Sequence, residues 1–192
     1  MSVGPSKVLA IDQSTSATKA VVFDIQGRLI DRYSVEHRPI YPKPGWVEHD
    51  AEALWRNTQS VIQSAAEKHR DFICLSITNQ RETFVIFDRS TGRPLHHAVV
   101  WQCRRGDEEC ARLIRNGHAD LVSEKTGLKI DSYFSAPKLA SLLRENPALR
   151  SKLQSGDALF GTIDTYLLYR LTNCKTFATD STNASRTLLF NI

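Results

Sequence analysis

The sequence lacks long apolar runs. No uninterrupted apolar stretch exceeds four residues, as in Val8–Ile11 and Ala98–Trp101. A helix that spans a bilayer needs about 20 apolar residues, so the sequence predicts no membrane insertion. The N-terminus offers one lysine and a short strand-like run before Asp12, which is not the pattern of a signal peptide. We therefore expect a cytoplasmic protein.

Cysteine is scarce, and the few cysteines are unevenly spaced. The sequence has four, none of them in a C-x-x-C pair. This count argues against a disulfide framework and against a zinc site. We interpret the thiols as buried or incidental in a reducing compartment. The cysteines are Cys74, Cys103, Cys110 and Cys174.

An excess of charge of one sign is also missing. The chain has 25 Lys and Arg against 21 Asp and Glu, a formal charge of +4. The basic residues are scattered, and the densest pair, Arg104-Arg105, is followed at once by Asp107, Glu108 and Glu109. Nucleic-acid binding usually needs a basic face or stripe, so the sequence does not predict it.

What is present is an ordinary globular composition. Hydrophobic residues make up 41% and charged residues 24% of the 192 positions, which argues against disorder. The length suits one domain or a large piece of one. We expect residues 7–192 to form this domain, after a short disordered N-terminus over residues 1–6.

The order of strand and helix patterns predicts an α/β domain with a mixed sheet. Apolar and β-branched runs predict strands, and apolar residues at helical spacing behind Asp50, a good N-cap, predict an amphipathic helix. Asn146 and Pro147, a cap followed by proline at the first helical position, restart a helix that Gly156 ends. The predicted strands are 8–11, 19–24, 29–35, 72–78, 83–87, 94–101 and 159–163; the predicted helices are 50–69, 105–116, 136–145, 147–156 and 164–171.

The polar turn after the first strand has the composition of a phosphate–magnesium site. Asp12 ends a buried strand, four hydroxyl side chains follow, and Lys19 comes next. Turn amides and hydroxyls can bind phosphate oxygens, and a carboxylate can hold hydrated Mg²⁺. The turn has no glycine and is not a Walker loop. An ordinary polar hairpin loop is the alternative interpretation.

Further polar clusters follow apolar strands. Arg81 and Glu82 form a donor and acceptor pair that suits the hydroxyls of a small polyol, and the indole of Trp101 can cover its carbon backbone. Tyr133 could add a phenol donor. A surface ion pair, a core tryptophan and a packed tyrosine are the alternatives.

The adjacent histidines His96 and His97 fall within a predicted strand. Neighbouring residues of a strand point to opposite faces. We therefore expect that these two side chains do not easily chelate one ion.

Seven blocks of the sequence, in order along the chain, resemble the glycerol kinases of the FGGY sugar-kinase family. They run from about residue 8 to the end, and several are specific to glycerol kinases within the wider family. The blocks are Asp12–Thr15, Tyr41–Asp50, Ile77–Thr83, Val100–Arg105, Asp131–Ser135, Phe160–Thr165 and Thr182–Ile192.

The resemblance implies a ribonuclease-H-like, actin-type ATPase fold and the phosphorylation of glycerol to glycerol 3-phosphate by ATP with Mg²⁺. Members of this family have a second domain of comparable fold, so the chain is incomplete relative to them. The resemblance places the catalytic base beyond Ile192 and assigns no catalytic residue to this chain. We therefore expect the isolated chain to be inactive or nearly so.

The resemblance also implies roles for single residues. Asp12 corresponds to the carboxylate that organises Mg²⁺, and the nucleotide-binding positions are Asp12, Thr15, Ser16 and Lys19. Arg81, Glu82 and Tyr133 correspond to the residues that hydrogen-bond glycerol, and Trp101 to the wall of its pocket. The partners implied are glycerol or a similar polyol, with the missing C-terminal half or a second copy of the chain left open.

Several positions depart from the family pattern. Ser14 replaces a glycine in the phosphate turn, and Lys19 replaces an arginine and loses its bidentate fork. Near Lys138, which is kept, Pro137 and Ser141 replace a small polar residue and a tryptophan. The altered phosphate turn favours one alternative, a non-catalytic module that binds a polyol or a partner. A kinase for another polyol is a further alternative, which Arg81-Glu82 and the block from Trp101 to Arg105 disfavour.

Overall fold

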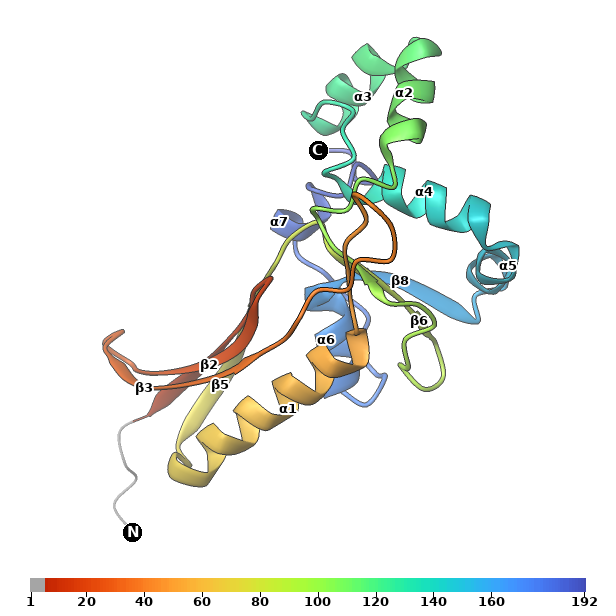
Figure 1. Ribbon diagram of the computed structural model, residues 1–192. Helices are drawn as coiled ribbons and strands as arrows, with labels where there is room; N and C mark the ends of the chain where they lie inside the picture. The colour runs from red at the N-terminus through yellow and green to blue at the C-terminus, as the bar shows by residue number, and fades with distance from the viewer. Residues whose placement is uncertain (1–5) are drawn as a thin grey trace. The chain divides into compact units, whose positions relative to one another are not determined.

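The computed structural model describes residues 6–192, and Figure 1 shows its helices and strands. The disordered N-terminus expected for residues 1–6 lies outside the described residues, except for Ser6. Over this described range, none of the helices has the length and apolar character needed to span a bilayer. The chain divides into two compact units. The first runs up to Arg38 and resumes over Glu52–Gln80, and the second comprises Pro39–Ala51 and Arg81–Ile192.

The first unit contains a mixed four-stranded sheet, as the sequence predicts. Its order is β3-β2-β1-β5, in which β1 pairs antiparallel with β2 and parallel with β5, and β2 pairs antiparallel with β3. The strands are β1 (Lys7–Gln13), β2 (Ala17–Asp24), β3 (Leu29–Glu36) and β5 (Phe72–Asn79).

Helix α1 (Ala51–Lys68) provides the crossover that a parallel β1–β5 pairing requires. Its buried Val61 and Ala65 pack on one face of the sheet, against a cluster that includes Ile11 and Val22. The helix predicted over residues 50–69 is confirmed to within one residue at each end.

The second unit contains an antiparallel sheet in the order β4-β7-β6-β8. Its strands are β4 (Glu48–His49), β6 (Phe84–Asp88), β7 (Ala98–Val99) and β8 (Ala158–Thr162). The strand predicted over 94–101 is wrong in extent, because only Ala98–Val99 pairs regularly. Pro94 makes an isolated bridge to Phe87 and has no N–H to continue a ladder.

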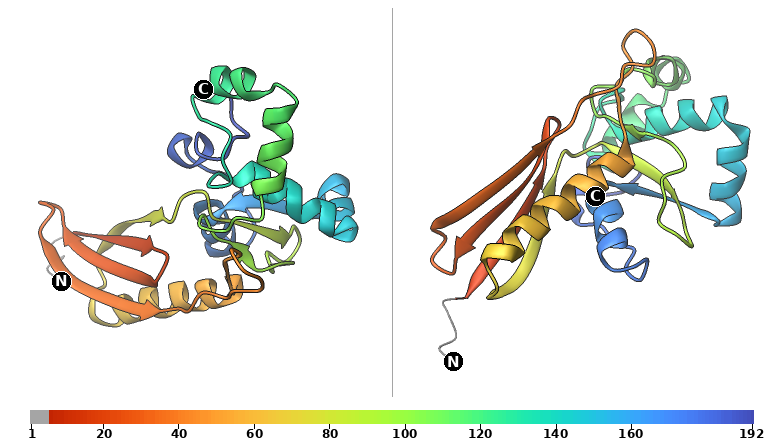
Figure 2. Two further views of the ribbon diagram at one scale, coloured as in Figure 1. Left: turned by 45° about the horizontal axis from the view of Figure 1, so that its top comes forward. Right: turned by 60° about the horizontal axis from the view of Figure 1, so that its bottom comes forward.

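The helices of the second unit, seen from two sides in Figure 2, include two that the sequence patterns do not predict. One is α3, which begins without a side-chain cap, and the other is α7, a single turn of four residues. The N-cap by Asn146 and the first-turn proline of α5 are confirmed. The helices are α2 (Asp107–Arg115), α3 (Ala119–Thr126), α4 (Ser135–Glu145), α5 (Pro147–Ser155), α6 (Ile163–Leu171) and α7 (Ser181–Ala184).

Strand β6 is buried on both of its faces. Phe84 and Ile86 belong to a core cluster with residues of α4 and α5. Phe87 packs on the other side against Tyr166 and Tyr169 of α6, with ring centroids 5.4 and 5.3 Å apart. A continuous apolar run is the expected sequence of a strand covered on both faces. This core supports the segment that leads into β6, where Arg81 and Glu82 lie.

Candidate functional site

The polar turn of the first unit joins β1 to β2. Asp12 and Lys19 are opposite each other in the antiparallel register, and the Lys19 Nζ lies 2.8 Å from Asp12 Oδ2. Lys19 also donates to Ser14 Oγ at 3.3 Å. Thr15 is half-buried and Ser16 is exposed in the turn itself. The structure therefore brings together all four residues predicted to contact a nucleotide.

Two buried glutamines hold this turn against the end of β5. Gln80 Nε2 donates to Gln13 Oε1 at 3.1 Å and to the Ser14 carbonyl at 3.3 Å, and the Gln80 N–H donates to the Gln13 carbonyl at 2.8 Å. Buried polar groups are stable only when they are hydrogen-bonded. In the sequence these glutamines were visible only as members of motifs, because the contact joins positions 67 residues apart.

His37 closes the other side of the turn. Its N–H donates to the Ser16 carbonyl at 3.1 Å. Burial lowers the pKa of His37, against a smaller opposing effect of the backbone at Thr15 and Ser14. A neutral imidazole adds no positive charge, so Lys19 is the cation of the turn.

The donor set at the turn fits a magnesium ion held mainly by water and phosphate. Mg²⁺ is usually bound through one or two carboxylates and keeps several waters. Asp12 supplies one carboxylate with its side chain 36% exposed, and Lys19 occupies only its Oδ2. Among residues 6–192 there is no group of three or more His, Cys, Asp or Glu that could form an all-protein metal site.

The second unit brings together Glu82, Trp101 and Tyr133. Glu82 is buried with a left-handed backbone, φ 63°, and its Oε1 accepts from Arg186 Nε at 2.7 Å. The guanidinium of Arg186 also lies 5.6 Å from the Tyr133 ring centroid. Tyr133 contacts Trp101, with ring centroids 5.4 Å apart at 57°. Arg81, the fourth predicted residue, is the exposed neighbour of Glu82.

Lys138 connects the backbones of the two aromatic residues. This fully buried side chain of α4 donates to the Tyr133 carbonyl at 2.6 Å and to the Trp101 carbonyl at 3.2 Å. Burial lowers the pKa of Lys138 to about 7, although Cys103 and Glu82 oppose the shift. In the sequence Lys138 is only a retained position of the family pattern, and no local pattern indicates that its side chain is buried between two backbone carbonyls.

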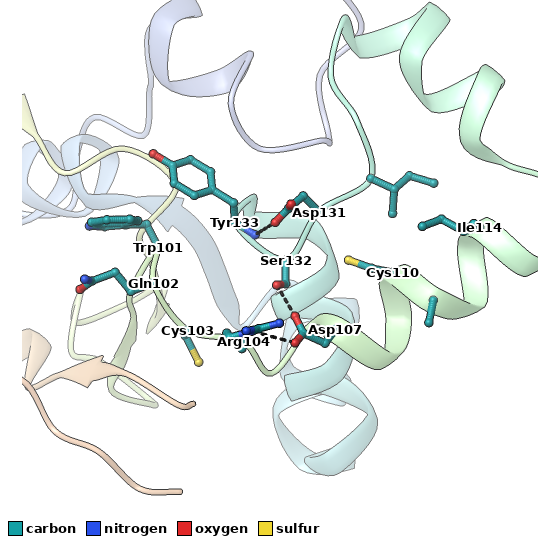
Figure 3. A pocket seen from close by; sticks show the side chains of 12 residues that line it. Trp101, Gln102, Cys103, Arg104, Asp107, Cys110, Ile114, Asp131, Ser132 and Tyr133 are labelled. Atoms are coloured by element: carbon teal, nitrogen blue, oxygen red, sulfur yellow. Dashed lines mark hydrogen bonds and ion pairs between the residues drawn. The ribbon is translucent and has the colours of Figure 1, made fainter. Parts of the chain in front are cut away.

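A pocket of about 700 Å³ adjoins these aromatic residues (Figure 3). Arg104 Nε donates to Asp107 Oδ2 at 2.9 Å, and Ser132 Oγ donates to Asp107 Oδ1. These bonds tie the start of α2 to the segment before α4. Arg81 and Glu82 are not among its lining residues, which are Trp101, Gln102, Cys103, Arg104, Asp107, Cys110, Ala111, Ile114, Ile130, Asp131, Ser132 and Tyr133.

The two adjacent histidines do not lie on a strand, contrary to the prediction, and both side chains lie near the carboxylate of Glu48. His97 Nδ1 lies 2.9 Å from Glu48 Oε2, and His96 Nε2 lies 3.8 Å from Glu48 Oε1. Both residues precede β7 in an irregular bend, so the alternation of a strand does not apply. Burial alone would raise the pKa of Glu48, but the hydrogen bond and charge of buried Arg105 lower it, and the histidines add to this effect.

The four cysteines are free thiols, and no disulfide links them. Cys103 and Cys110 line the pocket. Burial, with smaller effects of Asp131 and Asp107, raises the pKa of Cys110 to about 11. A thiol with a raised pKa is a poor nucleophile near neutral pH, so Cys110 does not have the features of a catalytic nucleophile.

The described residues thus form two polar clusters, one at a turn of the mixed sheet and one in the unit that contains the antiparallel sheet. Residues 7–192 match the N-terminal domain of the FGGY family of carbohydrate kinases. The chain belongs to this family. Its fold is the mixed α/β fold of these N-terminal domains.

The curated relatives include many glycerol kinases. The chain is 47% identical over 189 residues to glycerol kinase 1 of Thermotoga maritima and 49% identical over 191 residues to the glycerol kinase of Rhodopseudomonas palustris. These alignments cover 96% and 97% of this chain but 38% of each relative. The chain therefore spans well under half the length of these proteins.

The chain also resembles solved structures of carbohydrate kinases. The glycerol kinase of Plasmodium falciparum, crystallised with ADP, superposes with a TM-score of 0.89 at 37% identity and covers 98% of this chain and 38% of that one. Gluconate kinase from Lactobacillus acidophilus gives a TM-score of 0.87 at 23% identity, with 98% and 37% coverage. At that identity the second likeness shows the fold alone.

Proposed function

We propose that this chain is the acceptor-binding, N-terminal part of a glycerol kinase, an enzyme that transfers the terminal phosphate of ATP to glycerol and forms glycerol 3-phosphate. The observation that carries the proposal is the cluster of Glu82, Trp101 and Tyr133 in one unit of a chain that is 43–49% identical to glycerol kinases. The identity to the relatives indicates the substrate, and the cluster supplies the side chains to bind it.

The cluster can satisfy a small polyol in both hydrogen-bonding directions. Each hydroxyl of a polyol donates one hydrogen bond and accepts others. The Glu82 carboxylate accepts, the exposed Arg81 guanidinium donates, and the Tyr133 hydroxyl does either. The indole face of Trp101 offers an apolar surface for the carbon backbone. Together these groups would orient one terminal hydroxyl for attack.

The turn at the end of β1 would serve the nucleotide. We propose that Thr15, Ser16 and Lys19 contact phosphate oxygens of ATP and that Asp12 holds Mg²⁺ through its waters. A bound Mg²⁺ would neutralise phosphate charge during transfer. Phosphoryl transfer depends on positioning and charge stabilisation. The proton acceptor for the glycerol hydroxyl is proposed to lie outside these 192 residues, so the isolated chain binds glycerol and transfers phosphate slowly or not at all.

The test combines binding with turnover on the pure 192-residue chain. Calorimetry should detect glycerol binding to the wild-type chain and weaker binding to Tyr133→Phe, whereas Tyr41→Phe, at an exposed tyrosine (69%) outside the cluster, should bind like wild type. A coupled ADP-release assay should show no turnover above background. Absence of glycerol binding would overturn the acceptor role, and rapid turnover would overturn the proposed location of the base.

A non-catalytic polyol-binding module is a second candidate, favoured by the state of the phosphate turn. Lys19 is held by Asp12 at 2.8 Å, and the turn has serine where glycine would let the backbone approach a phosphate closely. Calorimetry with Mg-ATP separates the two proposals. Glycerol binding together with Mg-ATP binding supports the kinase part, and glycerol binding alone supports the module.

The proposal also includes the cellular location of the chain and its assembly. We propose a cytoplasmic location, which the free state of the cysteines supports. A further segment of the enzyme or a second copy of this chain would complete the site. Size-exclusion chromatography with light scattering distinguishes a monomer from a self-associating chain.

A further inference from the structure

Glu82 has a backbone conformation that its own chemistry does not favour. Its φ of 63° lies in the left-handed region, where side chains other than glycine are uncommon. Such residues persist only where the surrounding structure determines them, and they are concentrated at functional sites. Ser135 Oγ, at the start of α4, donates to the Glu82 carbonyl at 2.8 Å. The backbone of Glu82 is therefore held from one side by α4.

The side chain of Glu82 is held from another part of the chain. Arg186 lies 104 positions away, yet its Nε is 2.7 Å from Glu82 Oε1. The Glu82 side chain is 4% exposed and that of Arg186 is 34% exposed, so the pair is shielded from water on the carboxylate side. The hydrogen bond to Glu82, and secondarily its charge, raise the pKa of Arg186, so the guanidinium remains charged throughout the accessible pH range.

Arg186 is presented by an ordered segment. Asp180 caps α7 by accepting from the N–H groups of Thr182 and Asn183 at 2.7 and 2.9 Å, and the Arg186 N–H donates to the Asn183 carbonyl at 3.1 Å. The next residue, Thr187, accepts from the N–H of Ala136 in α4 at 2.9 Å. The same segment is thus tied to the helix that anchors the Glu82 backbone.

The guanidinium of Arg186 also contacts the aromatic side of the cluster. Its Cζ lies 4.9 Å from the Phe134 ring centroid and 5.6 Å from that of Tyr133. A cation within about 6 Å of an aromatic ring is attracted to it. One side chain therefore contacts both Glu82 and Tyr133, the acceptor and the phenol of the polyol cluster.

We propose that Arg186 is a positioning residue for the polyol: it holds Glu82 through Oε1 so that Oε2 accepts from a polyol hydroxyl, and it fixes the Tyr133 ring beside it. This inference rests on the proposed function. The role is specific to arginine. Its planar guanidinium can donate from Nε to Glu82 and contact the aromatic rings at the same time, whereas lysine keeps the charge but has no planar group.

The test is a double-mutant cycle read by glycerol affinity. Calorimetry on the full 192-residue chain compares wild type, Arg186→Met, Glu82→Gln and the double variant, with folding checked by circular dichroism. Arg186→Met should weaken glycerol binding by about tenfold. A loss of this size that depends on Glu82 is typical of residues in direct contact. In the Glu82→Gln background the same change should weaken it by less than about twofold. A purely structural arginine would lower stability in both backgrounds and leave the affinity of the folded chain unchanged.

The matched control is Arg112→Met, which breaks another pair between an arginine and a buried glutamate in the same unit, Arg112–Glu109 at 2.8 Å. It should leave glycerol affinity unchanged. If Arg186→Met does not fold, Arg186→Lys decides, with an expected loss of about fivefold. Wild-type affinity in a folded Arg186 variant, or additive losses in the cycle, would overturn the inference. A wild-type chain that does not bind glycerol would instead overturn the proposed function on which it rests.

Discussion

Replacing buried Lys138 by methionine tests whether this side chain loses its proton near neutral pH, well below the ordinary lysine range. The folded protein holds the pKa of Lys138 at about 7, against 10.5 for an ordinary lysine, mainly because burial disfavours the charged form. The unfolded chain therefore binds more protons than the folded one between these two values. The free energy of unfolding that depends on this group is highest above pH 10.5. It falls as the pH is lowered from 10.5 towards 7.

The magnitude follows from the size of the window. Each unit of pH inside it changes the difference in unfolding free energy between wild type and Lys138→Met by about 1.4 kcal/mol. Between pH 9.0 and pH 7.5 wild type should lose about 2 kcal/mol relative to the variant. Below about pH 6.5 the difference should level off, because both states then carry the proton.

Urea unfolding followed by circular dichroism and tryptophan fluorescence gives the free energies by linear extrapolation. Lys152→Met is the control, because this lysine of α5 is exposed, and its curve should run parallel to wild type across the same pH range. Lys138→Met curves that also run parallel to wild type would show that Lys138 titrates normally. In that case the two carbonyls at Trp101 and Tyr133 would be held by an ammonium group rather than by a neutral amine.

Two further changes test a helix cap and a close contact between a strand and a helix. Asn146→Ala should lower the unfolding free energy by about 1 kcal/mol, because the side chain caps α5 by accepting from the Leu149 N–H at 3.0 Å; Asn146→Asp should restore it, and an unaffected alanine variant in urea unfolding would refute the cap. Gly161→Ala should lower it by about 1–3 kcal/mol, because the new Cβ would lie 2.8 Å from Thr165 Cγ2. An unchanged midpoint of thermal unfolding in Gly161→Ala would show that β8 and α6 separate easily.

Local signals in the sequence were sufficient for most of the secondary structure. The helix behind Asp50, the restart at Asn146-Pro147 and the mixed sheet follow from periodicity and capping, which depend on neighbours only a few positions apart. The short extent of β7 and the bend at His96 and His97 could not be predicted. There the pairing depends on Glu48, a distant residue, and strand alternation fails where no ladder continues.

The candidate site divides in the same way. Asp12 and Lys19 are close in sequence, and their pairing follows from a hairpin register. The contacts of Glu82 with Arg186 and of Lys138 with Trp101 join positions 104 and 37 residues apart. No spacing rule connects such positions, because only the packed tertiary structure brings them together. The division into two units could not be predicted from the sequence either, because no flexible linker marks the boundary.

The ion pair across the β1–β2 hairpin has a consequence for how ligands would influence one another. Asp12 and Lys19 neutralise each other at 2.8 Å, so each is engaged until the other is drawn away. If Lys19 turns to a phosphate oxygen, Asp12 is left with a negative charge that a divalent cation would offset. If a cation binds Asp12 first, Lys19 is left with a positive charge that a phosphate would offset. Coupling between two sites is reciprocal. If the turn binds a nucleotide and its metal ion as proposed, the anion and the cation would therefore bind cooperatively rather than independently.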